Sequence, residues 1–177
     1  ERRETGVTAG RGGRMEGMAT ELAAVAGDRR LERLNVLYDA KLMTLSGTTN
    51  MTIAEDVGQR FAALGWQVQD VDGMDVDAVD AALAAARADE HRPSLIVART
   101  HIGFGSPNKH DSVEAHGEPL GTNEVRLTKR AYGWPEDAAF LVPPEAQQKF
   151  DEVRVRGAAA RGAWQQTMDT YRSEQAG

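Results

Sequence analysis

The sequence predicts an α/β fold in which helices flank a parallel sheet. Two observations carry this prediction. Short apolar runs of strand-forming residues alternate with segments of helical periodicity from residue 14 to residue 99, and the linkers between them are short. Such alternation is typical of parallel strands joined by helices that cover the sheet. Ligands of open sheets of this type bind beyond the carboxyl ends of the strands, so we expect the functional site there.

The first helix–strand unit begins with apolar residues that recur about every three to four positions. The predicted helix ends at Gly27, where glycine suits a C-cap, and its apolar face consists of Met15, Met18, Leu22 and Val25. The Gly- and Arg-rich opening before it has no periodicity and predicts no element. Residues 34–38 form a short apolar run that predicts a buried strand, followed by a polar turn region through Thr48.

Two further units follow in the same order. The second helix begins with the capping-box pair Thr52 and Glu55 and ends at Gly65. Its apolar face has helical spacing and consists of Ile53, Val57, Phe61 and Leu64. A strand with period-two alternation, an alanine-rich helix and an apolar strand complete the predicted sheet region, at residues 66–71, 75–88 and 93–99.

The last predicted strand is followed by a long polar loop, residues 100–122. Loops of this length in a compact domain are mostly functional or disordered. A short helix capped by Asn123 and extending to about Tyr132 is predicted next. We therefore divide the chain into one domain region, residues 1–142, and a C-terminal helical extension or linker, residues 143–177.

The composition restricts the class of protein. The chain has 177 residues, 41% of them hydrophobic, which is enough for the core of one domain. Its 27 acidic and 21 basic residues leave a net charge of −6, so we expect no nucleic-acid or anionic-membrane partner. The absence of cysteine excludes disulfides, cysteine-based metal sites and a thiol nucleophile.

The first residues and the lengths of the apolar runs indicate the cellular location of the protein and whether the chain is a fragment. No run approaches the roughly 18 consecutive apolar residues of a membrane helix, and the opening lacks the apolar run of a secretory signal. A cytoplasmic protein is therefore expected. Position 1 is Glu rather than Met, and we interpret the chain as a fragment of a longer reading frame.

Two motifs in the long polar loop indicate a family. Ile102-Gly103-Phe104-Gly105-Ser106-Pro107-Asn108-Lys109 is followed by His116-Gly117-Glu118-Pro119-Leu120-Gly121. Together they resemble the transketolase family, in which an I-G-x-G-S-P-N-K loop leads into an H-G-x-P-L-G segment. Further matches in chain order are Met15-Glu16-Gly17 with Glu21, Tyr38-Asp39, Glu55-Asp56-Val57 with Arg60-Phe61, Gly65-Trp66, Val71-Asp72-Gly73 with Asp75, and Pro93-Ser94-Leu95. The resemblance covers residues 10–172 and implies the later half of an N-terminal pyrophosphate-binding domain with the thiamine diphosphate-binding fold.

The resemblance implies an activity, cofactors and a partner. The family transfers a two-carbon ketol unit between sugar phosphates in the pentose phosphate pathway, with thiamine diphosphate and Mg²⁺. Its cofactor lies between the pyrophosphate domain of one subunit and the pyrimidine domain of the dimer mate. We therefore expect a homo- or heterodimer with a chain that supplies the pyrimidine domain, and no activity of this chain alone. The alternative is a noncatalytic, degenerate subunit or fragment that associates with another transketolase-like chain.

The resemblance also assigns site residues. His116 corresponds to the family's histidine that contacts the diphosphate and the substrate and moves protons at substrate oxygens, a task that suits a neutral imidazole. Gly10 and Gly12 correspond to the two glycines of the family's Gly-Asp-Gly motif. With His116 they form the predicted cofactor-binding set, in which Gly12 allows backbone N–H groups to approach phosphate.

The family's metal ligands are altered in this sequence. The two metal-binding side chains correspond to Arg11 and Lys41, and the ligating carbonyl corresponds to Met43. Mg²⁺ requires oxygen ligands, and neither guanidinium nor ammonium has a lone pair, so ordinary metal binding is not expected. Three explanations stay open: decay of the metal site, direct binding of the diphosphate by the two cations in place of the metal, and surface roles without function.

The remaining histidines have weaker claims to chemistry. His110 and Asp111 form an adjacent pair, but neighbouring loop residues rarely orient each other, and His101 stands apart in the sequence. His91 lies near a predicted helix end, where a histidine is favourable. No H-x-x-x-H or H-E-x-x-H spacing is present, so no zinc site is expected.

Overall fold

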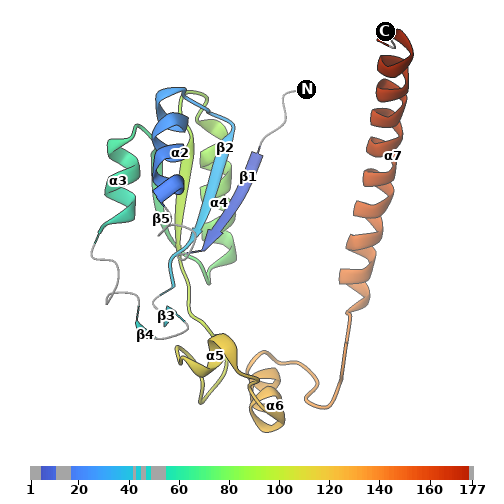
Figure 1. Ribbon diagram of the computed structural model, residues 1–177. Helices are drawn as coiled ribbons and strands as arrows, with labels where there is room; N and C mark the ends of the chain where they lie inside the picture. Colours follow the sequence, from blue (N-terminus) through green and yellow to red (C-terminus); the bar gives the residue numbers. More distant parts are fainter. Residues whose placement is uncertain (1–4, 11–16, 42, 45–46, 49–54, 176–177) are drawn as a thin grey trace. The chain divides into compact units, whose positions relative to one another are not determined.

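A four-stranded parallel sheet forms the core of the fold (Figure 1). The computed structural model describes residues 5–10, 17–41, 43–44, 47–48 and 55–175. The strands lie in the order β1 (Thr5–Gly10), β2 (Leu34–Asp39), β6 (Ser94–Arg99) and β5 (Gln67–Asp72). Every adjacent pair is parallel. The α/β prediction is therefore confirmed, and β1 is a strand that the sequence did not predict.

Helices cover both faces of this sheet. Side chains of successive strand residues point to opposite faces, and the central strand β6 is buried on both. Leu95 and Val97 pack in a cluster with α2 (Gly17–Asp28) and α3 (Val57–Ala63), whereas Ile96 packs with α4 (Val76–Ala88). A separate two-stranded antiparallel pair consists of β3 (Met43–Thr44) and β4 (Gly47–Thr48).

Phe61 and Trp66 lie in the core, as their place in the sequence suggested. Both side chains are buried, and their rings meet edge to face with centroids 4.9 Å apart. The indole N–H of Trp66 donates to the carbonyl of Ala23 at 2.8 Å, which satisfies the one polar atom of the buried ring. This hydrogen bond joins α2 to the segment between α3 and β5.

The predicted apolar face of α2 is wrong for the described residues. Met18, Leu22 and Val25 are exposed, and the helix instead packs through Ala23, Ala26 and Gly27; Met15 lies outside the described residues. Small residues permit a close approach: a Cβ on Gly27 would lie 1.9 Å from the carbonyl oxygen of Leu64. Gly27 is therefore required inside the packed helix rather than at its C-cap, because α2 ends one residue later.

The helix starts differ from the predictions in two places. The N-cap of α3 is Asp56, whose carboxylate accepts from the Gln59 amide at 2.9 Å, so the helix begins later than the capping box predicted. Thr52 lies outside the described residues. The predicted start of the helix at residue 75 is confirmed: Asp75 is the N-cap of α4, and its carboxylate accepts from two amides of the first turn.

The chain after β6 contains three helices: α5 (Glu114–Gly117), α6 (Thr122–Ala131) and α7 (Pro144–Glu174). The short helix α5 lies inside the segment predicted as loop. The N-cap of α6 is Gly121, with a φ of 87°, and not Asn123 as predicted. The chain consists of two compact units, Glu1–Glu136 and Asp137–Gly177. Within the described ranges, none of the helices combines the length and apolar character needed to cross a membrane.

Candidate functional site

Polar groups gather at the carboxyl edge of the parallel sheet. The register pairs Gly10 of β1 with Asp39 of β2, and Asp39 with Ala98 of β6. One carboxylate oxygen of Asp39 accepts a hydrogen bond from the hydroxyl of Thr100, the residue after β6. The other lies 3.2 Å from the ammonium nitrogen of Lys41. Asp39 thus joins the ends of two strands and holds the Lys41 ammonium at the same edge.

This donor set does not fit Mg²⁺. The ammonium of Lys41 offers no lone pair and already donates to the Asp39 carboxylate. An ion bound to that carboxylate at about 2.1 Å would lie about 5 Å from the ammonium, where the repulsion at an effective dielectric of 20 is about 7 kcal/mol before solvent screening. The Met43 backbone lies in β3, opposite Thr48. Arg11 and Gly12 lie outside the described residues.

The loop after β6 is tied to α6 by a buried carboxylate. Glu124 accepts hydrogen bonds from the Ser106 hydroxyl at 2.5 Å and from the backbone and side-chain amides of Asn108 at 2.8 and 2.9 Å. The hydrogen bond from Ser106, and then those from Asn108, hold the pKa of Glu124 below its ordinary value. The sequence did not reveal this role, because no local pattern links a helical glutamate to a loop serine 18 positions earlier.

Two glycines allow the same loop to turn. Gly103 and Gly105 have φ values of 63° and 81°, in the left-handed region that favours glycine. A Cβ on Gly105 would lie 2.6 Å from the ring of Tyr132, so the loop also runs close against the C-terminal end of α6. The Tyr132 hydroxyl donates to the carbonyl of Phe104. Glycine is therefore needed at these two positions for the backbone conformation of the loop, and at position 105 also for its packing against Tyr132.

His116 lies in α5, on the loop that leaves the sheet at its carboxyl edge. Figure 1 shows α5 beyond the ends of the strands, at the side of the sheet where β3 and β4 lie. The imidazole is exposed, and its backbone N–H donates to the carbonyl of Val113 at 3.0 Å. The structure thus places Gly10, Asp39 and Lys41 together at one edge, with His116 on the adjoining loop.

Two other histidines converge on one carboxylate. His101 Nδ1 lies 2.7 Å from Asp111 Oδ2, and His110 Nε2 lies 3.3 Å from the same oxygen. The two imidazole rings stack, with centroids 5.0 Å apart and an interplanar angle of 28°. The expectation that the neighbours His110 and Asp111 do not orient each other is therefore wrong. The third member, His101, comes from the other end of the loop.

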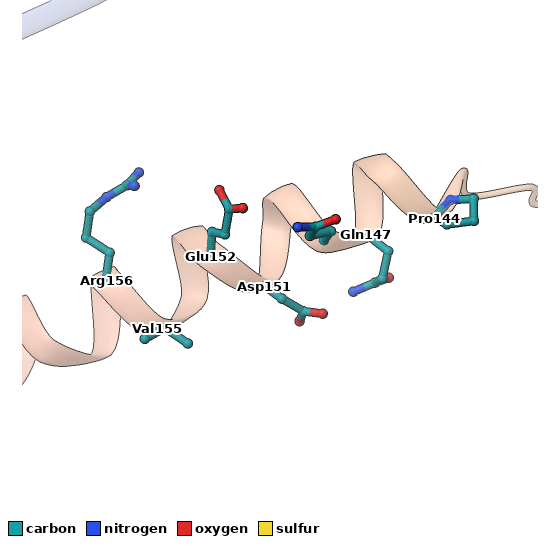
Figure 2. Close-up of a pocket in the computed structure, with 7 residues that line it drawn as sticks. Pro144, Gln147, Asp151, Glu152, Val155 and Arg156 are labelled. Atoms are coloured by element: carbon teal, nitrogen blue, oxygen red, sulfur yellow. The ribbon is translucent and has the colours of Figure 1, made fainter.

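A hollow along the first turns of α7 does not form a comparable site. It is lined by residues of this one helix (Figure 2). Figure 2 shows Glu152 and Arg156 on one side of the helix and Gln147, Asp151 and Val155 on the other. The polar groups diverge, so this surface offers no arrangement for catalysis.

The fold is that of an open α/β domain with a parallel sheet, a class in which ligands generally bind at the carboxyl ends of the strands. Residues 3–177 match the family described as transketolase, thiamine diphosphate binding domain. The chain is 43% identical over 159 residues to the transketolase of Rhodobacter capsulatus, covering 90% of this chain and 23% of the relative. It is 42% identical over 164 residues to that of Halalkalibacterium halodurans, covering 92% and 24%.

Solved structures agree with the sequence comparison. Transketolase from Campylobacter jejuni matches with a TM-score of 0.85 and 26% identity, covering 93% of this chain and 26% of that chain. Transketolase from Leishmania mexicana matches with a TM-score of 0.84 and 30% identity, covering 99% and 26%. The chain belongs to the transketolase family, in its thiamine diphosphate-binding domain. It spans about a quarter of the length of these relatives.

Proposed function

We propose that the chain forms part of a transketolase-type site that binds thiamine diphosphate and takes part in the transfer of a two-carbon ketol unit between sugar phosphates. The observation that carries this proposal is the carboxyl edge of the sheet. There Gly10, Asp39 and Lys41 meet, and the loop that carries His116 begins at the same edge. Membership of the transketolase family supports this assignment.

The residues at this edge suit an anionic diphosphate better than a metal ion. Lys41 is a point cation at the end of β2, and charged hydrogen bonds to phosphate are strong. We assign diphosphate binding to Lys41 and to the backbone of Gly10 and Gly12, with Arg11 as a second cation. Since the side chains at this edge do not suit Mg²⁺ as ligands, diphosphate binding in this proposal does not depend on Mg²⁺.

His116 supplies the proton chemistry in this proposal. When bound, thiamine diphosphate supplies the nucleophilic carbon that accepts the two-carbon unit. The exposed imidazole of His116 accepts and returns protons at substrate oxygens and contacts the diphosphate. It lies on the segment that follows β6, whose first part is bonded to Glu124 of α6.

The proposal includes a partner chain. The chain spans about a quarter of its relatives, and we propose a homo- or heterodimer in which the partner supplies the pyrimidine domain. We assign residues 1–142 to a partial pyrophosphate-binding domain and residues 143–177 to a helical extension. By itself the chain does not catalyse ketol transfer, and its role belongs to the pentose phosphate pathway.

A noncatalytic subunit is the second candidate function. The observation that favours it is the Lys41–Asp39 ion pair, which occupies the position of a metal-binding side chain. In this case the chain associates with another transketolase-like chain without binding the cofactor. The two candidates differ in one measurable property, the affinity for thiamine diphosphate.

Isothermal titration with thiamine diphosphate separates these candidates. The full 177-residue chain is titrated at low salt, with Mg²⁺ and with a chelator that removes divalent ions. Saturable binding that is the same in both buffers and is lost in His116→Ala supports the cofactor site. His91→Ala is the matched control: His91 lies between α4 and the start of β6, away from the carboxyl ends of the strands, so this variant should leave binding unchanged. Absence of saturable binding would favour the noncatalytic subunit, and a strict requirement for Mg²⁺ would refute the metal-independent site.

A further inference from the structure

The geometry points to a second binding site in this chain: His101, His110 and Asp111 bind a divalent metal ion, of which Zn²⁺ is the one we expect. Each residue offers one ligand atom, and these atoms all lie within 4.8 Å of one another. The three residues belong to the loop between β6 and α5. They are separate from the diphosphate-binding residues proposed above, which lie at the ends of β1 and β2.

Two ligand-atom distances can be compared with those of tetrahedral coordination. Zinc binds imidazole nitrogen and carboxylate oxygen at about 2.0–2.1 Å, so two ligand atoms at a tetrahedral angle lie about 3.3 Å apart. His110 Nε2 and Asp111 Oδ2 lie 3.3 Å apart. His101 Nδ1 lies 2.7 Å from the same oxygen, and this contact must open by about 0.6 Å. Both imidazoles are exposed, which leaves room for this small movement.

The backbone of the loop already holds the three side chains together. The amide of Asp111 donates to the carbonyl of Ile102 at 2.9 Å, which closes the loop next to His101. Asp111 has a φ of 53°, a left-handed conformation that aspartate and asparagine adopt more readily than other side chains. The Ser106–Glu124 hydrogen bond holds the middle of the loop. The loop backbone therefore brings the three side chains together before the ion binds, and the two stacked imidazoles must turn toward the ion.

The chemistry of the ligands selects the kind of metal. Two imidazoles and one carboxylate suit Zn²⁺, Ni²⁺, Cu²⁺ or Co²⁺, whereas Mg²⁺ prefers oxygen ligands throughout. Excess Mg²⁺ should therefore not compete. Three protein ligands leave the fourth tetrahedral position open to water or to an anionic group. The bound ion would join the two ends of the loop that leads to His116.

No motif in the sequence predicted this site, because the spacings typical of zinc motifs, such as H-E-x-x-H, are absent. His101 and Asp111 are ten positions apart and meet only because the intervening loop closes. His110 lies in the cluster because it is the chain neighbour of Asp111. A prediction from spacing alone therefore rejected zinc.

Titration of the 177-residue chain with zinc chloride tests this proposal. The titration contains excess Mg²⁺ and no thiamine diphosphate, so its outcome is independent of the cofactor site. The variants are His101→Gln, His110→Gln and Asp111→Asn, and the last keeps a residue that tolerates the left-handed backbone. His91→Gln is the matched control, as an exposed histidine outside the cluster. Far-ultraviolet circular dichroism verifies that each variant remains folded.

The expected result is one saturable Zn²⁺ site whose affinity falls at least about tenfold in each of the three variants and is unchanged in His91→Gln. Cobalt chloride should give the intense visible absorption of four-coordinate Co²⁺ in the parent chain, reduced in the same variants. The proposal is overturned if the parent chain shows no saturable site, if any of the three variants retains the parent affinity, or if Mg²⁺ displaces the bound zinc.

Discussion

Replacement of Gly105 by alanine tests whether the loop after β6 is held against α6. Gly105 has a φ of 81°, and a Cβ there would lie 2.6 Å from Cζ and 2.9 Å from the hydroxyl oxygen of Tyr132. The Tyr132 side chain is exposed and can rotate away. In doing so it loses its hydrogen bond to the carbonyl of Phe104. Gly105→Ala therefore combines backbone strain with the loss of one tertiary contact.

The magnitude follows from these two effects. A left-handed backbone costs an L-residue roughly 1–2 kcal/mol. The lost hydrogen bond from Tyr132 costs about 0.5–1.5 kcal/mol. We expect the free energy of opening of the loop to fall by roughly 1.5–3.5 kcal/mol, which corresponds to an opening constant about 10- to 300-fold larger.

Native-state hydrogen exchange measures this change locally. The amides of Ser106 and Asp111 donate to the carbonyls of Gly103 and Ile102, both at 2.9 Å, and report on closure of the loop. Both should exchange about 10- to 300-fold faster in Gly105→Ala, because exchange requires these bonds to open.

Two controls separate the causes. Gly65→Ala introduces the same strain, at a φ of 84°, in a turn where a new Cβ meets no atom within 4 Å, so it should leave exchange at Ser106 and Asp111 unchanged. In a Tyr132→Ala background, Gly105→Ala should lose the part of its cost that comes from the ring. Unchanged exchange in Gly105→Ala, or an equal cost with and without the Tyr132 ring, would refute the packing argument.

Three further changes test other parts of the structure. Because the pKa of Glu124 is lowered in the folded chain, its hydrogen bonds stabilise the loop above about pH 4.5 and are lost as the pH falls through the lowered value. The Ser106 amide should therefore lose protection from hydrogen exchange in acid. Glu124→Gln should abolish this pH-dependent loss, and a loss that persists in the variant would contradict the argument. Gly27→Ala places a Cβ against Leu64 and should lower the melting temperature by about 2–12 °C in circular dichroism, where no change would count against the packing of α2. Lys41→Met should weaken thiamine diphosphate binding roughly ten- to hundredfold in calorimetry, and equal affinity would remove Lys41 from the site.

Local sequence patterns predicted most elements of the sheet region. The strands at residues 34–38, 66–71 and 93–99 and the helix capped by Asp75 appear close to their predicted bounds. β1 was missed because Thr5–Gly10 is short and rich in glycine, with only Val7 and Ala9 as apolar residues, and it forms a strand by pairing with β2. The face of α2 was predicted wrongly because the largest apolar residues are not those that pack.

The sequence by itself determined the parallel α/β class and the loop motifs by which the family was recognised, since both depend on residues that are near one another in the chain. Only the tertiary structure decided which distant groups meet. The Thr100–Asp39 hydrogen bond depends on the register of β2 and β6, and the Glu124 contacts depend on the docking of α6. The cluster of His101, His110 and Asp111 depends on closure of a loop. Periodicity describes short-range backbone geometry, whereas these contacts arise from strand register and loop closure, which no local spacing encodes.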